Sequence, residues 1–191
     1  VSTYDGKSGG FEAPLFFVSP TQINFYVPER LQPADGSILV SNVNGMGSLG
    51  PMKIERVAPA LFAANANGQG VPAAVVLRIK TNGAQSYEPI AVFDSAQNKF
   101  VAQPIDLGPE SDQLFLILFG TGIRNRTALS NVVSTVGGVS VPVSFAGAQN
   151  DFVGVDQINI SLPRSLAKRG EVDLELTVDS KSANKLKINI K

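Results

Sequence analysis

The feature that most constrains the fold of this chain is a short strand motif that occurs twice. Residues 22–28 read QINFYVP and residues 157–163 read QINISLP, an offset of 157 − 22 = 135 residues. In both copies apolar residues alternate with others, which is the pattern of a strand with one apolar and one polar face. We call the shared polar and proline positions the duplicated motif: Gln22, Asn24 and Pro28 in the first copy, and Gln157, Asn159 and Pro163 in the second. Such a recurrence predicts duplication of a fold unit.

The sequence around the two copies corresponds as well. After each copy comes a polar break, then a β-rich segment and then a last strand, at 29–36, 37–43 and 52–57 in the first copy and at 164–170, 171–178 and 185–190 in the second. Before each copy the match is looser and pairs YDG at 4–6 with FAG at 145–147. We therefore predict two units, residues 1–57 and 58–191.

The first of these predicted units is too short to be complete. Its missing opening strands should correspond to residues 113–136 of the second unit. They lie upstream of Val1, or the first unit completes its sheets against the second. An unfinished sheet exposes an edge, and sheet edges are normally covered.

Short strand-like segments separated by turn residues predict an all-β fold, an immunoglobulin-like β-sandwich made of two related units. The 18 glycines and 12 prolines suit a chain with many turns. Gly137-Gly138 is the best tight hairpin, residues 164–168 are the one expected helical turn, and residues 114–119 read as a central strand buried on both faces. We expect strands near residues 15–18, 22–27, 37–43, 52–57, 73–79, 88–94, 99–107, 113–119, 132–136, 139–145, 156–162, 171–178 and 185–190.

Composition excludes several classes of function. Lysine and arginine total 16, as do aspartate and glutamate, so no basic field is available to attract nucleic acid or an anionic membrane. The longest strongly apolar run, residues 114–119, is far too short to cross a bilayer, so we expect no membrane insertion. Val1 begins inside what reads as folded sequence, so no signal peptide is visible.

Three residue types are absent, and each absence removes a kind of chemistry. Without histidine there is no imidazole acid–base catalysis and no His-ligated metal. Without cysteine there is no thiol catalysis, no thiolate metal site and no disulfide. Without tryptophan, a platform for stacking a sugar must be built from tyrosine or phenylalanine. We expect no cofactor and no enzymatic activity.

The amides of the duplicated motif have two interpretations. They form a polar recognition face, or they tie neighbouring loop backbones to the strand and so satisfy buried polar groups. The structural interpretation is favoured because the motif occurs in both copies, whereas a binding site is usually needed once. Tyr26 is the best candidate for a site unique to one copy, because its counterpart is Ser161. Together with Gln22 and Asn24, and with Tyr4 and Tyr87 as further exposed aromatics, it forms a candidate ligand-binding surface.

Acidic residues and a glycine turn supply weaker candidates. Calcium binding needs six to eight oxygen ligands, and the candidate donors are Asp106, Glu110 and Asp112, a second group of Asp151 and Asp156, and the amides of Asn65 and Asn67. Neither acidic stretch alternates like an EF-hand loop, so solvated loops are the favoured interpretation. Residues 120–122 read GTG after an apolar strand, but no lysine follows at P-loop spacing, so a turn between sheets is favoured over a phosphate site.

Four ordered signatures in the chain resemble a known family. They read APLFFVSPTQIN at 13–24, APALF at 58–62, FGTGI at 119–123, and FAG at 145–147 followed by VDQIN at 155–159 and Pro163. They are similar to the uncharacterised C-terminal domain family of Acidobacteria, found in Solibacter-type secreted proteins. Two positions depart from its pattern: residues 154–156 read GVD where Gly-Leu-Tyr is common, and residues 148–150 read AQN where Ala-Pro-Gly is typical.

The resemblance implies an extracellular or cell-surface, modular and non-catalytic role at the end of a longer polypeptide. Our first hypothesis is therefore a structural, anchoring or adhesion module whose partners are other domains of the same polypeptide. The alternative is a carbohydrate-binding module that uses exposed tyrosine and amide side chains on cell-surface or extracellular polysaccharide. A glycoside hydrolase that depends only on carboxylates ranks lowest.

Overall fold

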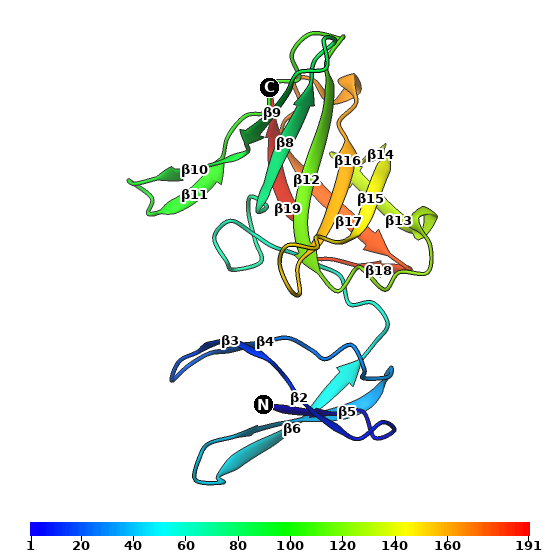
Figure 1. The fold of residues 1–191 in the computed structure, drawn as a ribbon. Coiled ribbons are helices and arrows are strands. Elements are labelled where there is room, and N and C mark those ends of the chain that lie inside the picture. Colours follow the sequence, from blue (N-terminus) through cyan, green and yellow to red (C-terminus); the bar gives the residue numbers. More distant parts are fainter. The chain divides into compact units, whose positions relative to one another are not determined.

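The computed structural model describes all residues, 1–191, and the chain divides into two compact units, Val1–Arg56 and Val57–Lys191 (Figure 1). The division falls one residue before the boundary expected from the sequence. No α-helix is present; the only helical elements are two 3₁₀ turns, η1 (Leu129–Asn131) and η2 (Arg164–Leu166). The second turn lies where the sequence predicts it. No helix is long and apolar enough to cross a membrane.

The first unit consists of one antiparallel sheet and a separate hairpin. The sheet has the strand order β2-β1-β5-β6, and the hairpin pairs β3 with β4. The strands β1 and β2 were not expected from the sequence. The bounds are β1 (Ser2–Tyr4), β2 (Gly10–Glu12), β3 (Leu15–Val18), β4 (Ile23–Phe25), β5 (Ala34–Ser41) and β6 (Gly47–Ile54).

The second unit contains two larger antiparallel sheets and a short hairpin, β10 with β11. One sheet has the order β15-β16-β12-β8-β9, with β7 also paired to β12; the other has the order β14-β13-β17-β18, with β19 also paired to β17. The bounds are β7 (Ala60–Leu61), β8 (Ala74–Ile79), β9 (Gln85–Pro89), β10 (Ala91–Asp94), β11 (Lys99–Ala102), β12 (Gln113–Thr121), β13 (Val132–Val136), β14 (Val139–Val141), β15 (Val143–Ala148), β16 (Asp156–Ser161), β17 (Gly170–Val178), β18 (Lys181–Ser182) and β19 (Leu186–Ile190).

The core of the second unit lies between its two sheets, so this unit is a β-sandwich, and the chain is all-β as predicted. Alternate residues along each strand point inward, as the period of two requires. The central positions are filled by fully buried aliphatic side chains from both sheets: Leu116, Leu118, Ile158, Ile160, Leu174, Leu176, Leu186 and Ile188. This packing is the dominant stabilising term of the unit.

Strand β12 occupies the centre of its sheet, as predicted, and pairs with β8 on one edge and β16 on the other. The expectation that it is buried on both faces holds in part, since Ile117 on its outward face is 6% exposed. Its inward residues are buried, but Phe115 and Phe119 on the outward face are only half-buried. A six-residue apolar run does not distinguish a strand buried on both faces from a strand with one partly exposed face, because a sheet also tolerates aromatic side chains on its outer face.

The tight turn between β13 and β14 has the geometry expected from its two glycines. Val136 pairs with Val139 across the turn, and Gly137 and Gly138 have φ angles of 55° and 75°. A two-residue hairpin of this kind requires positive φ at both central positions, which only glycine adopts without cost. The predicted hairpin is confirmed.

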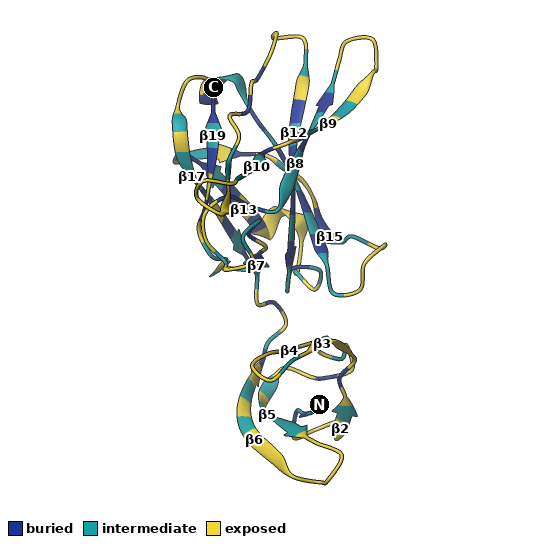
Figure 2. Cartoon of the chain, turned by 90° about the vertical axis from the view of Figure 1, so that its left-hand side faces the viewer, coloured by how far each residue is buried: buried dark blue, intermediate teal, exposed yellow.

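The first unit has almost no core. Its buried hydrophobic residues are Ala13, Leu31 and Ile54, and all four residues of β3 are between 48% and 61% exposed. Figure 2 shows the contrast between the dark blue strand interiors of the second unit and the yellow and teal strands of the first. The first unit thus carries apolar strands without the interior that such strands normally bury.

We predict that the same substitution in the two motif copies has unequal effects. Ile158→Ala removes a fully buried side chain and should lower the free energy of unfolding of the second unit by about 2–5 kcal/mol. Ile23→Ala, at the matching position, removes a half-buried side chain and should cost the first unit much less. Urea unfolding of the full chain, with residue-resolved amide exchange as the readout, measures the loss of stability in each unit. Equal losses would contradict the difference in burial.

Candidate functional site

The two copies of the duplicated motif form two hairpins with the same local construction. In the first, β3 pairs with β4, and in the second, β15 pairs with β16. Each ladder contains one register shift, between Leu15 and Phe17 and between Val143 and Phe145. Phe17 then lies opposite Asn24, and Phe145 lies opposite Asn159. The bulge bends both hairpins at the same position relative to the motif.

The motif amides bind each other within the strand in both copies. The Nε2 amide of Gln22 donates to Oδ1 of Asn24 over 2.7 Å, and that of Gln157 donates to Oδ1 of Asn159 over 2.8 Å. We expected these amides to tie loop backbones to the strand, and the hydrogen bonds found are between the two side chains instead. Residues i and i+2 point to the same face of a strand, which makes this bond available.

The chain enters and leaves both motif strands by matching main-chain hydrogen bonds. The N–H of Tyr26 donates to the carbonyl of Pro14, and that of Ser161 donates to the carbonyl of Pro142, both over 2.9 Å. After each motif proline a turn closes on a buried leucine. These bonds run from Leu31 to the Pro28 carbonyl at 3.2 Å and from Leu166 to the Pro163 carbonyl at 3.1 Å.

This pairing corrects two correspondences expected from the sequence. The structural counterpart of Phe145 is Phe17, not Tyr4, because both phenylalanines occupy the position after the bulge. The sheet order β2-β1-β5-β6 also matches β14-β13-β17-β19. Strand β13 (Val132–Val136) therefore has a counterpart in β1, although we expected residues up to 136 to have none. The weak strand signal of β1, three residues long, concealed it.

The predicted ligand-binding surface around Tyr26 differs from expectation. Gln22 and Asn24 are exposed, but Tyr26 is half-buried and its hydroxyl donates to Oε1 of Glu29 over 2.6 Å. Tyr4 is also half-buried, whereas Tyr87 is 65% exposed and lies on β9 in the other unit. The aromatics that accompany the motif amides are the exposed Phe16 and Phe17, which lie in the strand expected near residues 15–18 and were not among the predicted site residues.

We define the β3–β4 surface as the exposed residues on both faces of this hairpin: Phe17, Gln22 and Asn24 on one face, Leu15 and Val18 on the other, and Phe16 at the register shift. Phe17 and Asn24 face each other across the ladder, so aromatic and amide groups are adjacent. The strand β4 pairs with β3 and with no other strand. Contiguous exposed apolar side chains of this kind mark interaction sites. This surface is the candidate functional site of the chain.

The acidic calcium candidates are engaged by basic groups. Arg78, almost fully buried, donates to both oxygens of Glu88 at 2.6 and 3.0 Å and to Oδ2 of Asp112 at 3.2 Å. Asp106 accepts from Nζ of Lys191 and from the N–H of Gly108. No group of three or more acidic side chains is placed to hold a metal ion.

The remaining calcium candidates form local hydrogen bonds or lie exposed in a loop. Glu110 is exposed in its loop. The amide of Asn65 exchanges two hydrogen bonds with the main chain of Phe100, each of 2.8 Å, and Asn67 accepts from the N–H of Gln69. Asp151 interacts with Gln149. The geometry therefore provides no support for calcium binding.

The loop that contains Asp106 and Asp112 is fixed by two arginines. Arg78 donates to the carbonyls of Asp106 and Leu107. Arg164, in η2, donates to four carbonyls, those of Leu107, Gly108, Pro109 and Asp112. A surface hollow borders this loop, and its charged lining includes Arg78, Asp106 and Asp112. Of the charged groups that line this hollow, Arg78, Asp106 and Asp112 belong to the hydrogen-bond network of the loop, and Lys80 is the fourth.

The glycine turn at residues 120–122 is also structural. Gly122 has φ 73°, and the following N–H groups of Ile123 and Arg124 donate to the fully buried carboxylate of Asp156 at 2.7 and 3.1 Å. The Nε of Arg124 donates to the other oxygen at 2.7 Å. An internal carboxylate thus occupies the donors that a phosphate would need, and it joins the end of β12 to the start of β16.

The carboxylates show no sign of a glycosidase pair. The Arg78 guanidinium holds the pKa of Glu88 below its usual range, and the pKa values of Asp94, Asp106 and Glu175 are lowered by their hydrogen-bond donors. A general acid for glycoside cleavage needs a raised pKa. These groups are arranged to stay ionised, which suits ion pairing.

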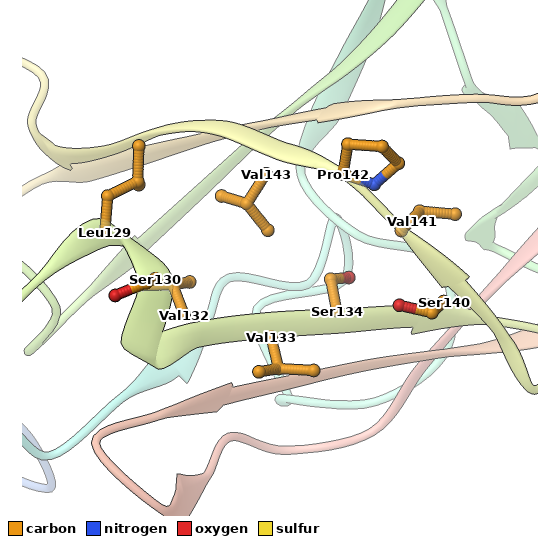
Figure 3. A pocket seen from close by; sticks show the side chains of 9 residues that line it. All are labelled: Leu129, Ser130, Val132, Val133, Ser134, Ser140, Val141, Pro142 and Val143. Carbon is orange, nitrogen blue, oxygen red and sulfur yellow. The ribbon is translucent and has the colours of Figure 1, made fainter.

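An apolar hollow on the second unit contains no titratable group. Figure 3 shows its lining, which combines valine, leucine and proline side chains with three serine hydroxyls. The lining residues are Leu129, Ser130, Val132, Val133, Ser134, Ser140, Val141, Pro142 and Val143. Of the hydroxyls, that of Ser134 already donates to the carbonyl of Glu175.

A second exposed aromatic feature is the β10–β11 hairpin, which projects from the sheets of its unit (Figure 1). The rings of Phe93 and Phe100 pack edge to face, with centroids 5.4 Å apart and an angle of 70° between planes. Asn65 holds the hairpin near its turn through hydrogen bonds with the main chain of Phe100. The two phenylalanine rings of this hairpin therefore contact each other, whereas no ring contact of this kind involves Phe16 or Phe17 of the β3–β4 surface.

Comparison with protein-family models, with curated proteins and with solved structures found no match.

We predict an acid-dependent loss of stability in the first unit that depends on Asp5. Its buried carboxylate accepts three main-chain N–H bonds, from Gln32, Ser8 and Lys7, at 2.8, 2.6 and 2.8 Å, and these donors hold its pKa well below the usual value of 3.8. Because the pKa of Asp5 is lower in the folded state than in the unfolded state, its stabilisation of the first unit is complete above the unfolded-state pKa. This stabilisation is lost progressively as the pH falls from the unfolded-state pKa toward the folded-state pKa.

Thermal unfolding between pH 7 and pH 2.5, followed by NMR signals of the first unit, tests this prediction. The Asp5→Asn variant should be less stable at pH 7 and should lose less on acidification than the parent chain. Asp35→Asn, in which an exposed aspartate is changed, serves as the control and should retain the parent pH dependence. An unchanged pH profile in Asp5→Asn would contradict the assignment.

Proposed function

We propose that this chain is a non-catalytic structural module, used for anchoring or adhesion, of a larger extracellular or cell-surface protein. It acts through protein–protein contacts at the β3–β4 surface, and its partners are other domains of the same polypeptide. The observation that carries the proposal is the contiguous exposure of Leu15, Phe16, Phe17 and Val18 on an otherwise uncharged hairpin. Solvent exposure of four adjacent large apolar residues is unfavourable unless a partner covers them.

The second unit supports this role as a scaffold. Its core is filled, and Glu88, Asp106, Asp112 and Asp156 are paired with arginines or a lysine. These features suit a rigid, non-catalytic body. The extracellular location rests on the resemblance of the four signatures to the Acidobacteria C-terminal domain family, as does the immunoglobulin-like description of the sandwich.

We predict that Phe17→Lys reduces binding of an apolar fluorescent dye to the full chain. The substitution places a charge in the middle of the β3–β4 surface, so less contiguous apolar area remains for the dye. Phe152→Lys is the matched control, since Phe152 is a similarly exposed phenylalanine outside this surface. Dye titration by fluorescence measures both variants. Equal effects of the two substitutions would show that the β3–β4 surface is not a distinct docking site.

Carbohydrate binding is the second candidate, and one observation favours it. Phe17 lies directly opposite Asn24, whose side chain is bonded to Gln22, so an exposed ring is adjacent to two exposed amides. Sugar sites combine an aromatic face with amide donors and acceptors. In this version Phe17 takes the role that we first assigned to Tyr26.

A thermal-shift screen of the full chain against soluble polysaccharides tests this candidate. Binding to the native state predicts a saturable rise in Tm with one glycan, and Asn24→Ala should remove that rise. Asn44→Ala, at an exposed asparagine in the turn between β5 and β6, should leave it unchanged. The absence of any saturable shift across the screen would reject the candidate.

A further inference from the structure

The two motif hairpins differ at one edge. In the second unit β16 lies between β15 and β12, so both of its edges are paired. In the first unit β4 is paired with β3 on the matching side, and the edge equivalent to the β12 side has no partner strand. The bulge, the amide pair, the proline carbonyl bond and the closing turn are shared, so the two edges are directly comparable.

Hydrogen-bonding groups on the open edge of β4 belong to alternate residues. The N–H of Tyr26 is directed toward β3, because it donates to the Pro14 carbonyl. Successive residues of an antiparallel strand direct their N–H and C=O groups to opposite sides. Ile23, Phe25 and Val27 therefore present their main-chain groups to the open edge. In the second unit the counterpart of Val27 is Leu162, whose N–H donates to the carbonyl of Leu114 in β12 over 3.0 Å.

The side chains at these positions are apolar in both units but buried in only one. Ile158, Ile160 and Leu162 are buried in the second unit. Their counterparts Ile23 and Phe25 are half-buried, and Val27 is exposed. The same difference holds beside them, since Ala146 is fully buried while its counterpart Val18 is 61% exposed. In the second unit Leu114, Leu116 and Leu118 of β12 lie beside these positions in the same sheet and extend the same buried face.

Some strands at sheet edges carry residues that discourage pairing, whereas β4, like the edge strands β14 and β15, does not. Strand β6 contains Pro51 and Lys53, β9 ends at Pro89, and β19 contains Lys187. Proline and lysine are the usual means of protecting an edge from added strands. Strand β4 reads Ile-Asn-Phe, with neither charge nor proline.

We propose that the open edge of β4 binds an added antiparallel β-strand with the chemistry of β12, supplied by another domain of the larger protein. The added strand places large aliphatic residues opposite Phe25 and Ile23, as Leu116 and Leu118 lie opposite Ile160 and Ile158. Residues of its other face lie opposite Asn24 and Gln22. Main-chain bonds provide affinity, and the aliphatic positions provide selectivity. The inference rests on the proposed function and names the chemical class of its partner.

The test uses the full chain and a synthetic peptide carrying residues 111–122, which include β12, with lysines appended at both ends for solubility. Amide exchange is measured by NMR with and without the peptide, and sedimentation velocity records the state of association. We expect saturable one-to-one binding that slows exchange at Ile23, Phe25 and Val27 by about tenfold or more. A peptide with Leu116→Asn and Leu118→Asn has the same main chain and should give no protection.

Protein variants provide the second arm. Phe25→Lys introduces a charge at the edge and should weaken binding of the β12 peptide by about tenfold or more. Val43→Lys adds the same charge at a fully exposed loop position and should change the affinity by less than about twofold. The peptide comparison leaves the protein unaltered, so it remains decisive if Phe25→Lys fails to fold.

Three outcomes would overturn the proposal. The first is no saturable protection at β4, and the second is equal protection by the asparagine-substituted peptide. The third is protection of β4 from amide exchange in the absence of peptide. If this protection is present in the monomer, the edge is already covered within the chain. If it appears only as the protein concentration rises and dimers form, the occupant is a second copy. If β4 gains no protection while Phe17→Lys still lowers dye binding, the docking surface stands and strand addition fails. Equal dye binding in the two phenylalanine variants would reject the proposed function itself.

Discussion

The structure depends on one constraint, which is that the motif strand must be covered on its apolar face and paired along both edges. In the second unit β12 pairs with one edge of β16 and adds leucines beside it, and the opposite sheet covers the apolar face that the two strands share. Burial of apolar surface is the main source of stability, and an unpaired buried main chain is costly. The same motif in the first unit lacks this neighbour. The difference between a filled sandwich and an exposed hairpin follows from it.

The polar side chains of the second unit serve this architecture. Arg78 and Arg164 hold the loop between β11 and β12, and Asp156 with Arg124 joins the end of β12 to the start of β16. Paired charges of this kind keep the pKa of a carboxyl low, as at Glu88 beside the Arg78 guanidinium. The exposed apolar residues of β3–β4, by contrast, are not covered within the chain, which is why the proposed docking surface is placed there.

Much of the fold could be predicted from the sequence because strand alternation and turn chemistry are local. The hairpin at Gly137-Gly138, the turn at η2 and the central position of β12 all follow from residues close together in the chain. The candidate site was predicted only in part. Gln22 and Asn24 are exposed as a recognition face requires, but Tyr26 bonds to Glu29, and Phe16 and Phe17 supply the aromatics. Apolar residues in a strand predict burial, and the sequence does not reveal a missing neighbour.

The sequence by itself determined that the chain is all-β, that one strand motif recurs, and that histidine and cysteine chemistry is absent, since these depend on composition and short-range pattern. Only the tertiary structure decided which motif copy is buried and where each acidic group is engaged. It also showed that Phe17 is the counterpart of Phe145. The physical reason is that burial, ion pairing and edge pairing are properties of neighbours brought together from distant parts of the chain. Two nearly identical strands therefore have different environments when one has β12 beside it and the other has none.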